Sequence, residues 1–249
     1  MVSYHEAIVM AYSGHLKQAT TKAAAAADLA QRAGEREPAA LIKAGATLWD
    51  AFFGNVTAAR QGVKETLKLS KGRDVEYGAA LALALSADSA GAQPLTDDLA
   101  KRFPEDSSVQ MSYLPVLRAV LALDHGEPSK AIESLGVTPY ELGLPLSWSN
   151  GSFGALYPIY VRGEAFLKAR QGAEAAVEFQ KILDHRGIAG ADAIGALARL
   201  QIGRAFQISG ETAKAKAAYQ DFLNLWKDAD PDTPIFKDAK AEYAKLQDR

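Results

Sequence analysis

Apolar residues recur at intervals of three and four along most of the chain, which is the spacing of one buried face on an α-helix. Near the C-terminal end, one such series is followed, after a short polar segment, by a second. The first series is Leu197, Leu200, Gly203 and Phe206, and the second is Ala215, Ala218, Tyr219, Phe222 and Trp226. The pattern predicts two amphipathic helices joined by a tight turn.

The predicted turn carries a signature that recurs elsewhere in the chain. Residues 126–131 and 210–215 share the pattern Gly-Glu-x-x-Lys-Ala, and the same step from glycine to alanine separates Gly14 from Ala19 and Gly54 from Ala59. Glycine is suited to end the first helix because it adopts a left-handed backbone without a steric penalty. The alanine then begins the second helix where the two helices come closest. Each unit is therefore predicted to be a helix, a tight turn and a second helix.

Two parts of the chain also align with each other at an offset of 40 residues. Residues 160–166 align with 200–206, and residues 179–183 align with 219–223. We assign the small residue of each second helix to Ala19, Ala59, Ala92, Ala131, Ala175 and Ala215. This assignment predicts about six helix pairs and about 13 helices in all. The third pair fits least well, because Gly91 directly precedes Ala92 and Thr96 stands where an aromatic residue is expected.

The order of residues in these units resembles that of the tetratricopeptide repeat (TPR) family. Two units carry the family's succession of a small residue, an aromatic, a second small residue and a second aromatic. These are Gly163, Phe166, Ala175 and Phe179, and again Gly203, Phe206, Ala215 and Tyr219. The resemblance implies an all-α fold, a TPR-like right-handed α-solenoid of antiparallel helix pairs. It covers residues 1–233, and an apolar stripe in 234–249 predicts a C-terminal capping helix that ends the array.

Several segments of the last hundred residues resemble a narrower group, the C-terminal TPR region of bacterial eukaryotic-like serine/threonine protein kinases of the acidobacterial type. They are residues 139–143, 156–158, 160–163, 179–187 and 219–231. The resemblance implies the repeat region of a bacterial signalling protein. No glycine-rich phosphate loop or kinase catalytic-loop motif is present in the sequence, so kinase activity is not carried over to this chain.

A long loop is predicted at residues 136–156, where prolines, glycines and aromatic residues interrupt the helical pattern. Long loops inside compact arrays are usually functional or mobile. One interpretation is a flap over the concave groove, with Tyr140 and Trp148 as contact residues. The alternative is that the aromatic side chains of the loop pack back against the helices.

Composition excludes several classes of function. The chain of 249 residues is 48% hydrophobic and has a formal net charge of −2, which predicts a buried core and gives no basic footprint for nucleic acid. It has no cysteine and no long uninterrupted apolar segment, so we expect no disulfide and no membrane insertion of this chain. The lack of cysteine suits the cytoplasm, the default compartment, and the periplasm equally. An extracytoplasmic position follows if the repeats come after a membrane span in a longer kinase.

Candidate catalytic and metal-binding residues are few. His5, His15, His125 and His185 form no pair with the spacing of a metal site. Asp184 and His185 are adjacent in sequence, yet neighbours on a helix point in different directions and no nucleophile motif accompanies them. We interpret this segment as a helix end with Gly187 as its cap. The sequence thus predicts no enzyme, no cofactor and no metal.

The resemblance implies that the first helix of each pair lines a concave face, the usual binding face of TPR proteins. The partner-binding candidates in this register are Tyr12, Tyr77, Tyr113, Tyr157, Tyr160, Glu164, Lys168, Arg204 and Gln207. Tyr77, Tyr113 and Tyr157 are expected to form a stripe across adjacent units, since tyrosine supplies contact area with little loss of entropy. The alternative for each tyrosine is a place in the core between helices.

The predicted function is therefore a scaffold that binds a protein or peptide partner. One alternative is a small-molecule sensor that binds its ligand in the groove under the 136–156 loop, which a defined pocket would favour. Self-association is a further possibility, because the N-terminal repeat has no predicted cap.

Overall fold

The computed structural model describes residues 2–136 and 153–247, with the side chains described from Tyr4 onward. Within these ranges the chain is all-α, with fourteen α-helices, one π-helix and no strand. The predicted contact residues Tyr140 and Trp148 lie outside the described residues. The helix count exceeds the 13 expected because a short helix, α11 (Arg186–Ala189), begins directly after His185, the C-cap of α10. Gly187 therefore lies inside α11 and is not the cap of the preceding helix.

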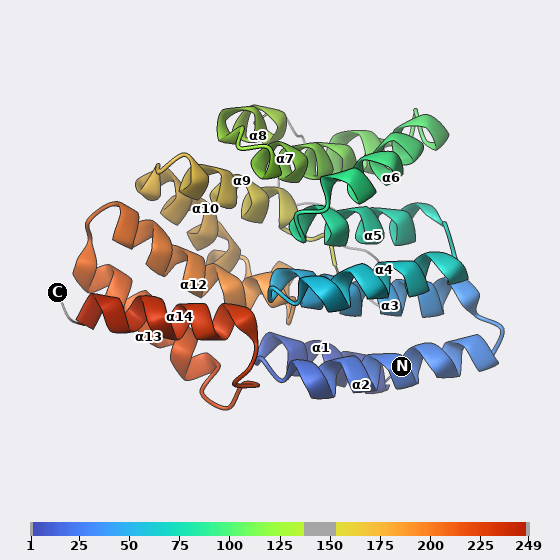
Figure 1. Ribbon diagram of the computed structural model, residues 1–249, viewed down its shortest axis with the longest axis horizontal. Helices are drawn as coiled ribbons and strands as arrows, with labels where there is room; N and C mark the ends of the chain where they lie inside the picture. The colour runs from blue at the N-terminus through green and yellow to red at the C-terminus, as the bar shows by residue number, and fades with distance from the viewer. Residues whose placement is uncertain (1, 137–152, 248–249) are drawn as a thin grey trace.

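The helices follow one another in pairs (Figure 1). Six pairs contact each other within the pair and stack on the next. They are α1 (Val2–Tyr12) with α2 (Leu16–Arg32), α3 (Arg36–Phe52) with α4 (Val56–Leu69), α5 (Arg73–Leu85) with α6 (Ser89–Arg102), α7 (Leu114–Asp124) with α8 (Pro128–Leu135), α9 (Tyr157–Lys168) with α10 (Gly172–Asp184), and α12 (Ala193–Ile208) with α13 (Thr212–Leu225). A single helix, α14 (Pro234–Gln247), follows the last pair.

All six turns within the pairs have the same backbone conformation. One residue is left-handed in each, and the backbone N–H groups of that residue and the next donate to the carbonyls three and five residues before them, as in Gly14 to Ala11 and His15 to Met10. This is the Schellman arrangement, which satisfies the last carbonyls of a helix. The left-handed residues are Gly14, Gly54, Ala87, Gly126, Arg170 and Gly210. The predicted glycines therefore do end helices, and alanine and arginine take that place in the third and fifth pairs.

Small residues allow the two helices of a pair to approach closely. Ala19, Ala59, Ala92, Ala131, Ala175 and Ala215, the six alanines assigned from the sequence, are all fully buried. On the facing helices, a Cβ placed on Gly163 would lie 2.6 Å from Cζ of Phe179, and one on Gly203 would lie 2.9 Å from Cδ2 of Tyr219. The small and aromatic residues of the repeat pattern are thus in direct contact, which fixes the distance between helices.

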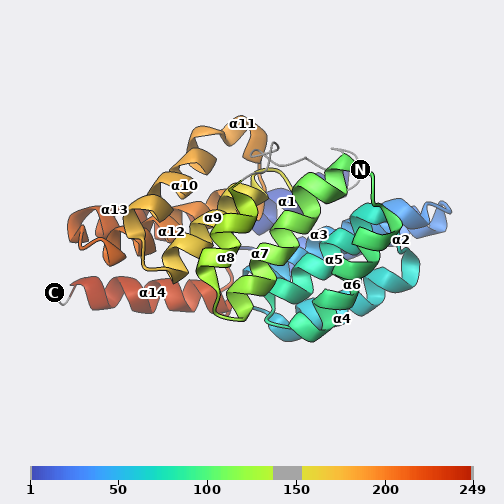
Figure 2. The same ribbon diagram turned by 90° about the horizontal axis from the view of Figure 1, so that it is seen from above.

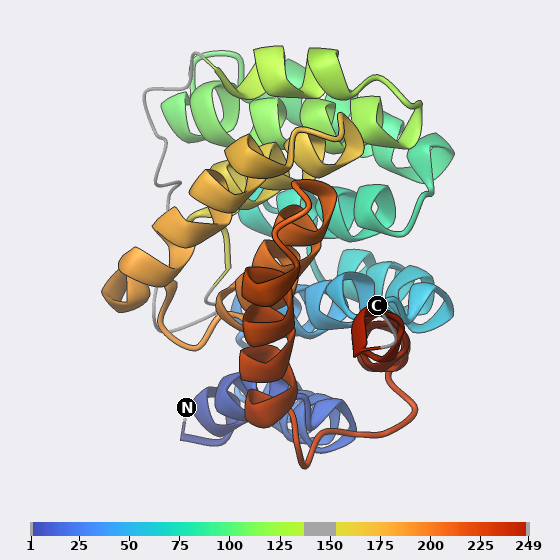
Figure 3. The same cartoon turned by 90° about the vertical axis from the view of Figure 1, so that its left-hand side faces the viewer.

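The array curves until its end contacts its beginning. In Figures 1 and 3 the last helices lie beside the blue N-terminal helices, and α12 contacts both α1 and α3. The indole Nε1 of Trp226 donates to the carbonyl oxygen of Tyr12 at 3.0 Å, and the N–H of Asp230 donates to the carbonyl of Gly14 at 3.0 Å. Residues separated by more than 200 positions therefore close the molecule.

A π-helix, η1 (Val109–Tyr113), leads directly into α7. It turns the side chain of Tyr113 into the interior, where the ring stacks on Tyr77 at 3.9 Å between centroids and 6° between planes. In the described residues, no helix has the combination of length and apolar character needed to cross a membrane.

Candidate functional site

The tyrosines predicted to line a concave face lie in the interior of the closed array. Tyr77, Tyr113, Tyr157 and Tyr160 each expose 3% or less of their surface. Phe153, which precedes α9, packs beside Tyr77 at 6.5 Å between centroids, and Phe52 contacts Tyr157 and Tyr160 edge to face at 5.5 and 5.6 Å. Tyr77, Tyr113 and Tyr157 therefore take the alternative place, the core between helices. Tyr160 is buried as well, but part of it lines a pocket that is described below.

A buried carboxylate stands among the interior tyrosines. Asp192 is the N-cap of α12, where it accepts from the N–H of Ile194 at 3.1 Å and from the hydroxyl of Tyr157 at 3.2 Å. Burial raises the pKa of Asp192 to about 7, against the lowering effect of these two hydrogen bonds. Burial and then the charge of Asp192 also raise the pKa of Tyr4 and Tyr77. The carboxylate thus links α12 to α9 through Tyr157, and its charge acts on tyrosines of α1 and α5.

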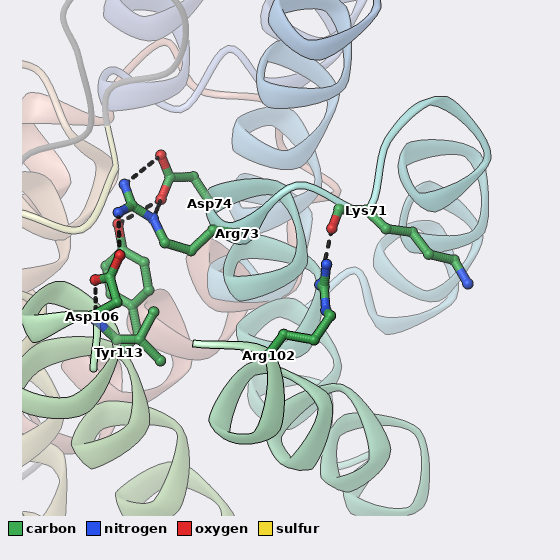
Figure 4. Close-up of polar contacts among 7 residues, drawn as sticks. Lys71, Arg73, Asp74, Arg102, Asp106 and Tyr113 are labelled. Carbon is green, nitrogen blue, oxygen red and sulfur yellow. Dashed lines mark hydrogen bonds and ion pairs between the residues drawn. The ribbon is translucent and has the colours of Figure 1, made fainter. Parts of the chain in front are cut away.

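A second polar cluster joins α5 to the π-helix (Figure 4). Arg73 pairs with Asp74 at 2.7 Å and with Asp106 at 2.8 Å, and the hydroxyl of Tyr113 donates to Asp74 at 2.9 Å. Asp106 also accepts from the N–H of Val109 at 3.1 Å, at the start of the π-helix. Every member of this cluster has a partner within it. The cluster therefore holds Tyr113 in position for its stacking on Tyr77.

A pocket lies where the carboxyl ends of α3, α5 and α7 meet α9. It has a volume of about 280 Å³. Its lining residues are Ala51, Phe52, Ala84, Leu85, Ala87, Val120, Leu123, Asp124, Tyr160, Val161, Glu164, Lys168, Gln201 and Ile235. The walls are mainly apolar, and the polar groups come from α7, α9 and α12. In Figures 1 and 2, α9 lies between the α7–α8 pair and α12. It contributes Tyr160, Val161, Glu164 and Lys168 to the lining.

The pocket is built from equivalent positions of four consecutive pairs. Phe52, Leu85, Asp124 and Lys168 each stand two residues before the left-handed turn residue of their pair. The same position is Tyr12 in the first pair and Ile208 in the last. The stacking of the pairs brings these last-turn side chains to one opening. One position of the repeat thus supplies a side chain to the pocket from each of four pairs.

Glu164 is the most enclosed charged group of the pocket. Its carboxylate accepts from the side-chain amide of Gln201, and a hydrogen bond links it to the hydroxyl of Tyr160. Burial raises the pKa of Glu164 above its usual value, and the neighbouring charges of Arg204 and Lys168 only partly offset this effect. Among the described residues, no cation lies within ion-pair distance of Glu164, and Lys168, one helical turn further along α9, is exposed.

A neighbouring pocket of about 490 Å³ continues along the same helices. Leu167, Arg170, Arg204, Gln207, Ile208 and Glu242 line it. Glu242 on α14 holds Arg204 with two hydrogen bonds of 2.9 and 2.8 Å, and the hydroxyl of Tyr219 donates to the same carboxylate at 2.7 Å. Arg204 is therefore already paired with Glu242, and among the described residues Glu164 has no ion pair.

The structure brings five of the nine predicted partner-binding residues to these two pockets: Tyr160, Glu164, Lys168, Arg204 and Gln207. Tyr12 lies elsewhere, half-buried in a third pocket, where Arg199 donates to its hydroxyl at 3.1 Å. Phe52, Asp124 and Gln201 are pocket residues that the sequence reasoning missed. The sequence does contain a pattern that could have identified them. Phe52 and Asp124 precede turn glycines by two residues, and Gln201 is a polar residue within an apolar series.

Two of the histidines make local hydrogen bonds at helix ends. His185 is the C-cap of α10, with Nδ1 at 2.7 Å from the carbonyl of Lys181, and His15 Nδ1 lies 3.0 Å from the hydroxyl of Ser13. No group of three or more potential metal ligands occurs in residues 2–136 and 153–247. What the pockets provide is a recess with apolar walls and a few fixed polar groups, which suits binding.

Comparison of the chain with models of known protein families, and with curated proteins, gives no match.

Proposed function

We propose that this chain is a TPR-like right-handed α-solenoid that binds a protein or peptide partner, with the 280 Å³ pocket as the centre of the binding site. The observation that carries the proposal is the use of one repeat position, two residues before the turn, by four consecutive pairs to line a single opening. Arrays of helix pairs create extended binding surfaces in this way, from equivalent positions of neighbouring units.

The six fully buried alanines and the six identical turns support the TPR-like part of this proposal. The resemblance of residues 139–143, 156–158, 160–163, 179–187 and 219–231 to the repeat region of bacterial kinases supports a role in signalling. In this proposal the chain recruits a partner and performs no reaction itself.

A partner reaches the pocket from outside the closed interior. Glu164, Arg204 and Gln207 are partly exposed and Lys168 is exposed, so these residues are accessible around the two openings. Interface energy is usually concentrated in a few side chains that fill pockets, surrounded by polar contacts of smaller effect. We therefore infer that one side chain of the partner enters the 280 Å³ pocket and that the rest of the partner lies over α9, α12 and α14.

A small-molecule sensor is the second candidate, and the size of the pocket favours it. The volume of 280 Å³ is close to the lower end of the range of about 300–1,000 Å³ that is typical of small-molecule sites. Among its described lining residues none comes from 153–156, so the ligand in this case is held by the helix ends.

Selection of peptides from a phage-displayed library on the immobilised chain tests the main proposal. Leu123→Trp places a large side chain into the pocket from the last turn of α7, and Val177→Trp makes the same type of change at an exposed position of α10. We expect the selected peptides to lose most of their binding to Leu123→Trp and to keep it with Val177→Trp. Peptides that bind all three proteins equally, or no enrichment at all, contradict the proposed site.

A further inference from the structure

We infer that the 280 Å³ pocket recognises a positively charged group on an aliphatic stem, namely a lysine or arginine side chain of the partner. This inference rests on the proposed function, because it names the chemistry of the side chain that enters the proposed site. Three separate features of the pocket carry it: the charges in its wall, the helix ends around it, and the shape of its apolar part.

The first feature is the balance of charge. Asp124 and Glu164 contribute two carboxylates to the wall, and Lys168 contributes the one cation. Glu164 has hydrogen bonds to the neutral groups of Gln201 and Tyr160, and the neighbouring cation Arg204 is held by Glu242 in two hydrogen bonds. A partly buried carboxylate without an ion pair is stabilised by any cation that replaces the missing partner.

The second feature is the direction of the helices. The last turns of α3, α5 and α7 all line the pocket, through Phe52, Leu85 and Asp124. The carboxyl end of a helix carries a partial negative charge and stabilises cations placed near it. Three such ends around one opening add to the effect of Glu164 and disfavour an anionic ligand.

The third feature is the apolar part of the lining. Phe52, Val120, Leu123 and Ile235 contribute to the walls, and the ring of Tyr160 stands beside that of Phe52. Lysine and arginine bury their methylene stems along such surfaces and keep the charged head on a polar partner. Aromatic rings near the head group add a cation–π contribution.

Lys168 offers a control within the same pocket. It stands four residues after Glu164 on α9, so it is the side chain that a bound cation has to approach or displace. Replacing Glu164 with glutamine removes one negative charge and keeps the shape of the side chain. Replacing Lys168 with glutamine removes the positive charge, so it makes the net charge of the pocket more negative.

The test uses two small probes of equal stem length, n-butylammonium and butyrate, titrated into the ¹⁵N-labelled full chain and followed by NMR. We expect n-butylammonium to shift the side-chain amide of Gln201 and the backbone amides of Leu123 and Asp124, and butyrate to leave them in place. Glu164→Gln is expected to weaken n-butylammonium binding about 10-fold or more, since charged hydrogen bonds contribute strongly. Lys168→Gln is expected to bind this probe as tightly as the original chain or more tightly.

The inference is overturned if butyrate binds and n-butylammonium does not, or if Glu164→Gln leaves the affinity unchanged while its thermal unfolding shows an intact fold. Its failure is distinguishable from that of the proposed function. Selected peptides that depend on an open pocket but contain no lysine or arginine contradict the charge assignment alone. Peptides that ignore the Leu123→Trp substitution contradict the binding site itself.

Discussion

At the scale of single residues, the turn within each pair is where backbone conformation and side-chain identity are most closely linked. Four of the six left-handed turn residues are glycine, whereas Ala87 and Arg170 hold the same conformation with φ of 51° and 59°. A side chain in this region costs about 1–2 kcal/mol, because Cβ approaches the following carbonyl oxygen. The third and fifth pairs therefore carry local strain that the others lack.

Arg170→Gly is expected to stabilise the chain by about 0.5–1 kcal/mol, since the relief of strain exceeds the entropy that glycine gains in the unfolded state. Arg170 is exposed, and its side chain makes no hydrogen bond or ion pair with the described residues, so little else is lost. Urea unfolding followed by circular dichroism measures the change. As the matched control, Gly126→Ala at the same turn position of the fourth pair should destabilise by about 1–2 kcal/mol. A loss of stability in Arg170→Gly contradicts the account of the turn.

Asp192 makes the stability of the chain depend on pH. Its pKa of about 7 in the folded state lies above the ordinary value near 4, so the folded chain retains a proton that the unfolded chain loses. Stability from this group is fully present below about pH 4, falls as the pH rises from 4 to 7, and then stays constant.

Asp192→Asn is expected to remove this decline, because asparagine carries no charge. Its Oδ1 can still accept from the N–H of Ile194, and its Nδ2 can donate to the hydroxyl of Tyr157 in place of the bond that Asp192 accepts there. The variant should be more stable than the original chain at pH 8, by an amount on the order of a few kcal/mol at most. Unfolding free energies measured at several values between pH 4 and 8 show the effect, and Asp221→Asn, at an exposed position of α13, is the control. Parallel pH profiles for the original chain and Asp192→Asn would show that Asp192 does not cause the decline in stability.

At the scale of helices, the spacing within a pair depends on small residues facing aromatic rings. Gly163 on α9 lies under the ring of Phe179 on α10, and Gly203 on α12 lies under Tyr219 on α13. Both contacts are closer than a Cβ atom tolerates. The repeat pattern of small and aromatic residues therefore sets the distance between the helices of a pair through packing, without a hydrogen bond or an ion pair.

Gly163→Ala should accordingly destabilise the chain by about 1–3 kcal/mol or more, although alanine favours helix formation, because the added methyl group overlaps Phe179. Gly187→Ala in α11 is the matched control. A Cβ there meets nothing within 4 Å, so this variant is expected to be neutral or slightly stabilising. Thermal unfolding of both variants distinguishes them, and equal melting temperatures would show that the helices move apart without cost.

At the scale of the whole molecule, closure of the array decides which surfaces are exposed. The fully buried ring of Trp226 packs on Phe53, Phe222 and Phe236 at 4.9, 4.8 and 5.9 Å between centroids. Asp230 adds to the contact by accepting from the N–H of Lys17 at 2.7 Å. Elements from the two ends of the chain thereby share one core.

Trp226→Ala is expected to cost about 3–5 kcal/mol and to loosen both ends of the chain together. Hydrogen exchange should show lower protection in α1 and in α14, and small-angle X-ray scattering should show a larger radius of gyration. Trp226→Phe keeps a ring at this place and loses the donation to Tyr12, so its loss should be nearer 1 kcal/mol. Unchanged protection of α1 in Trp226→Ala would mean that closure does not depend on this contact.

Part of the proposed binding site was predictable from the repeat register alone. Glu164 and Lys168 were identified as first-helix positions of the fifth pair, and both reach the 280 Å³ pocket. Phe52, Asp124 and Gln201 were missed because they come from other pairs, and a pocket formed between pairs depends on how those pairs are rotated against each other. The stripe of Tyr77, Tyr113 and Tyr157 was expected on a surface. It lies inside because the rotation of the pairs turns it toward the interior.

The helix pairs, their turns and the alanines between them are predictable from the sequence because they depend on local features. They follow from the three- and four-residue spacing of apolar side chains and from the conformations open to glycine, both of which act over a few residues. Closure of the array, the burial of Tyr77, Tyr113, Tyr157 and Tyr160, and the meeting of four helix-end positions in one pocket appear only in the folded chain. Small rotations between successive pairs add up over the whole chain, so these features depend on contacts between distant residues, such as the hydrogen bond from Trp226 to the carbonyl of Tyr12.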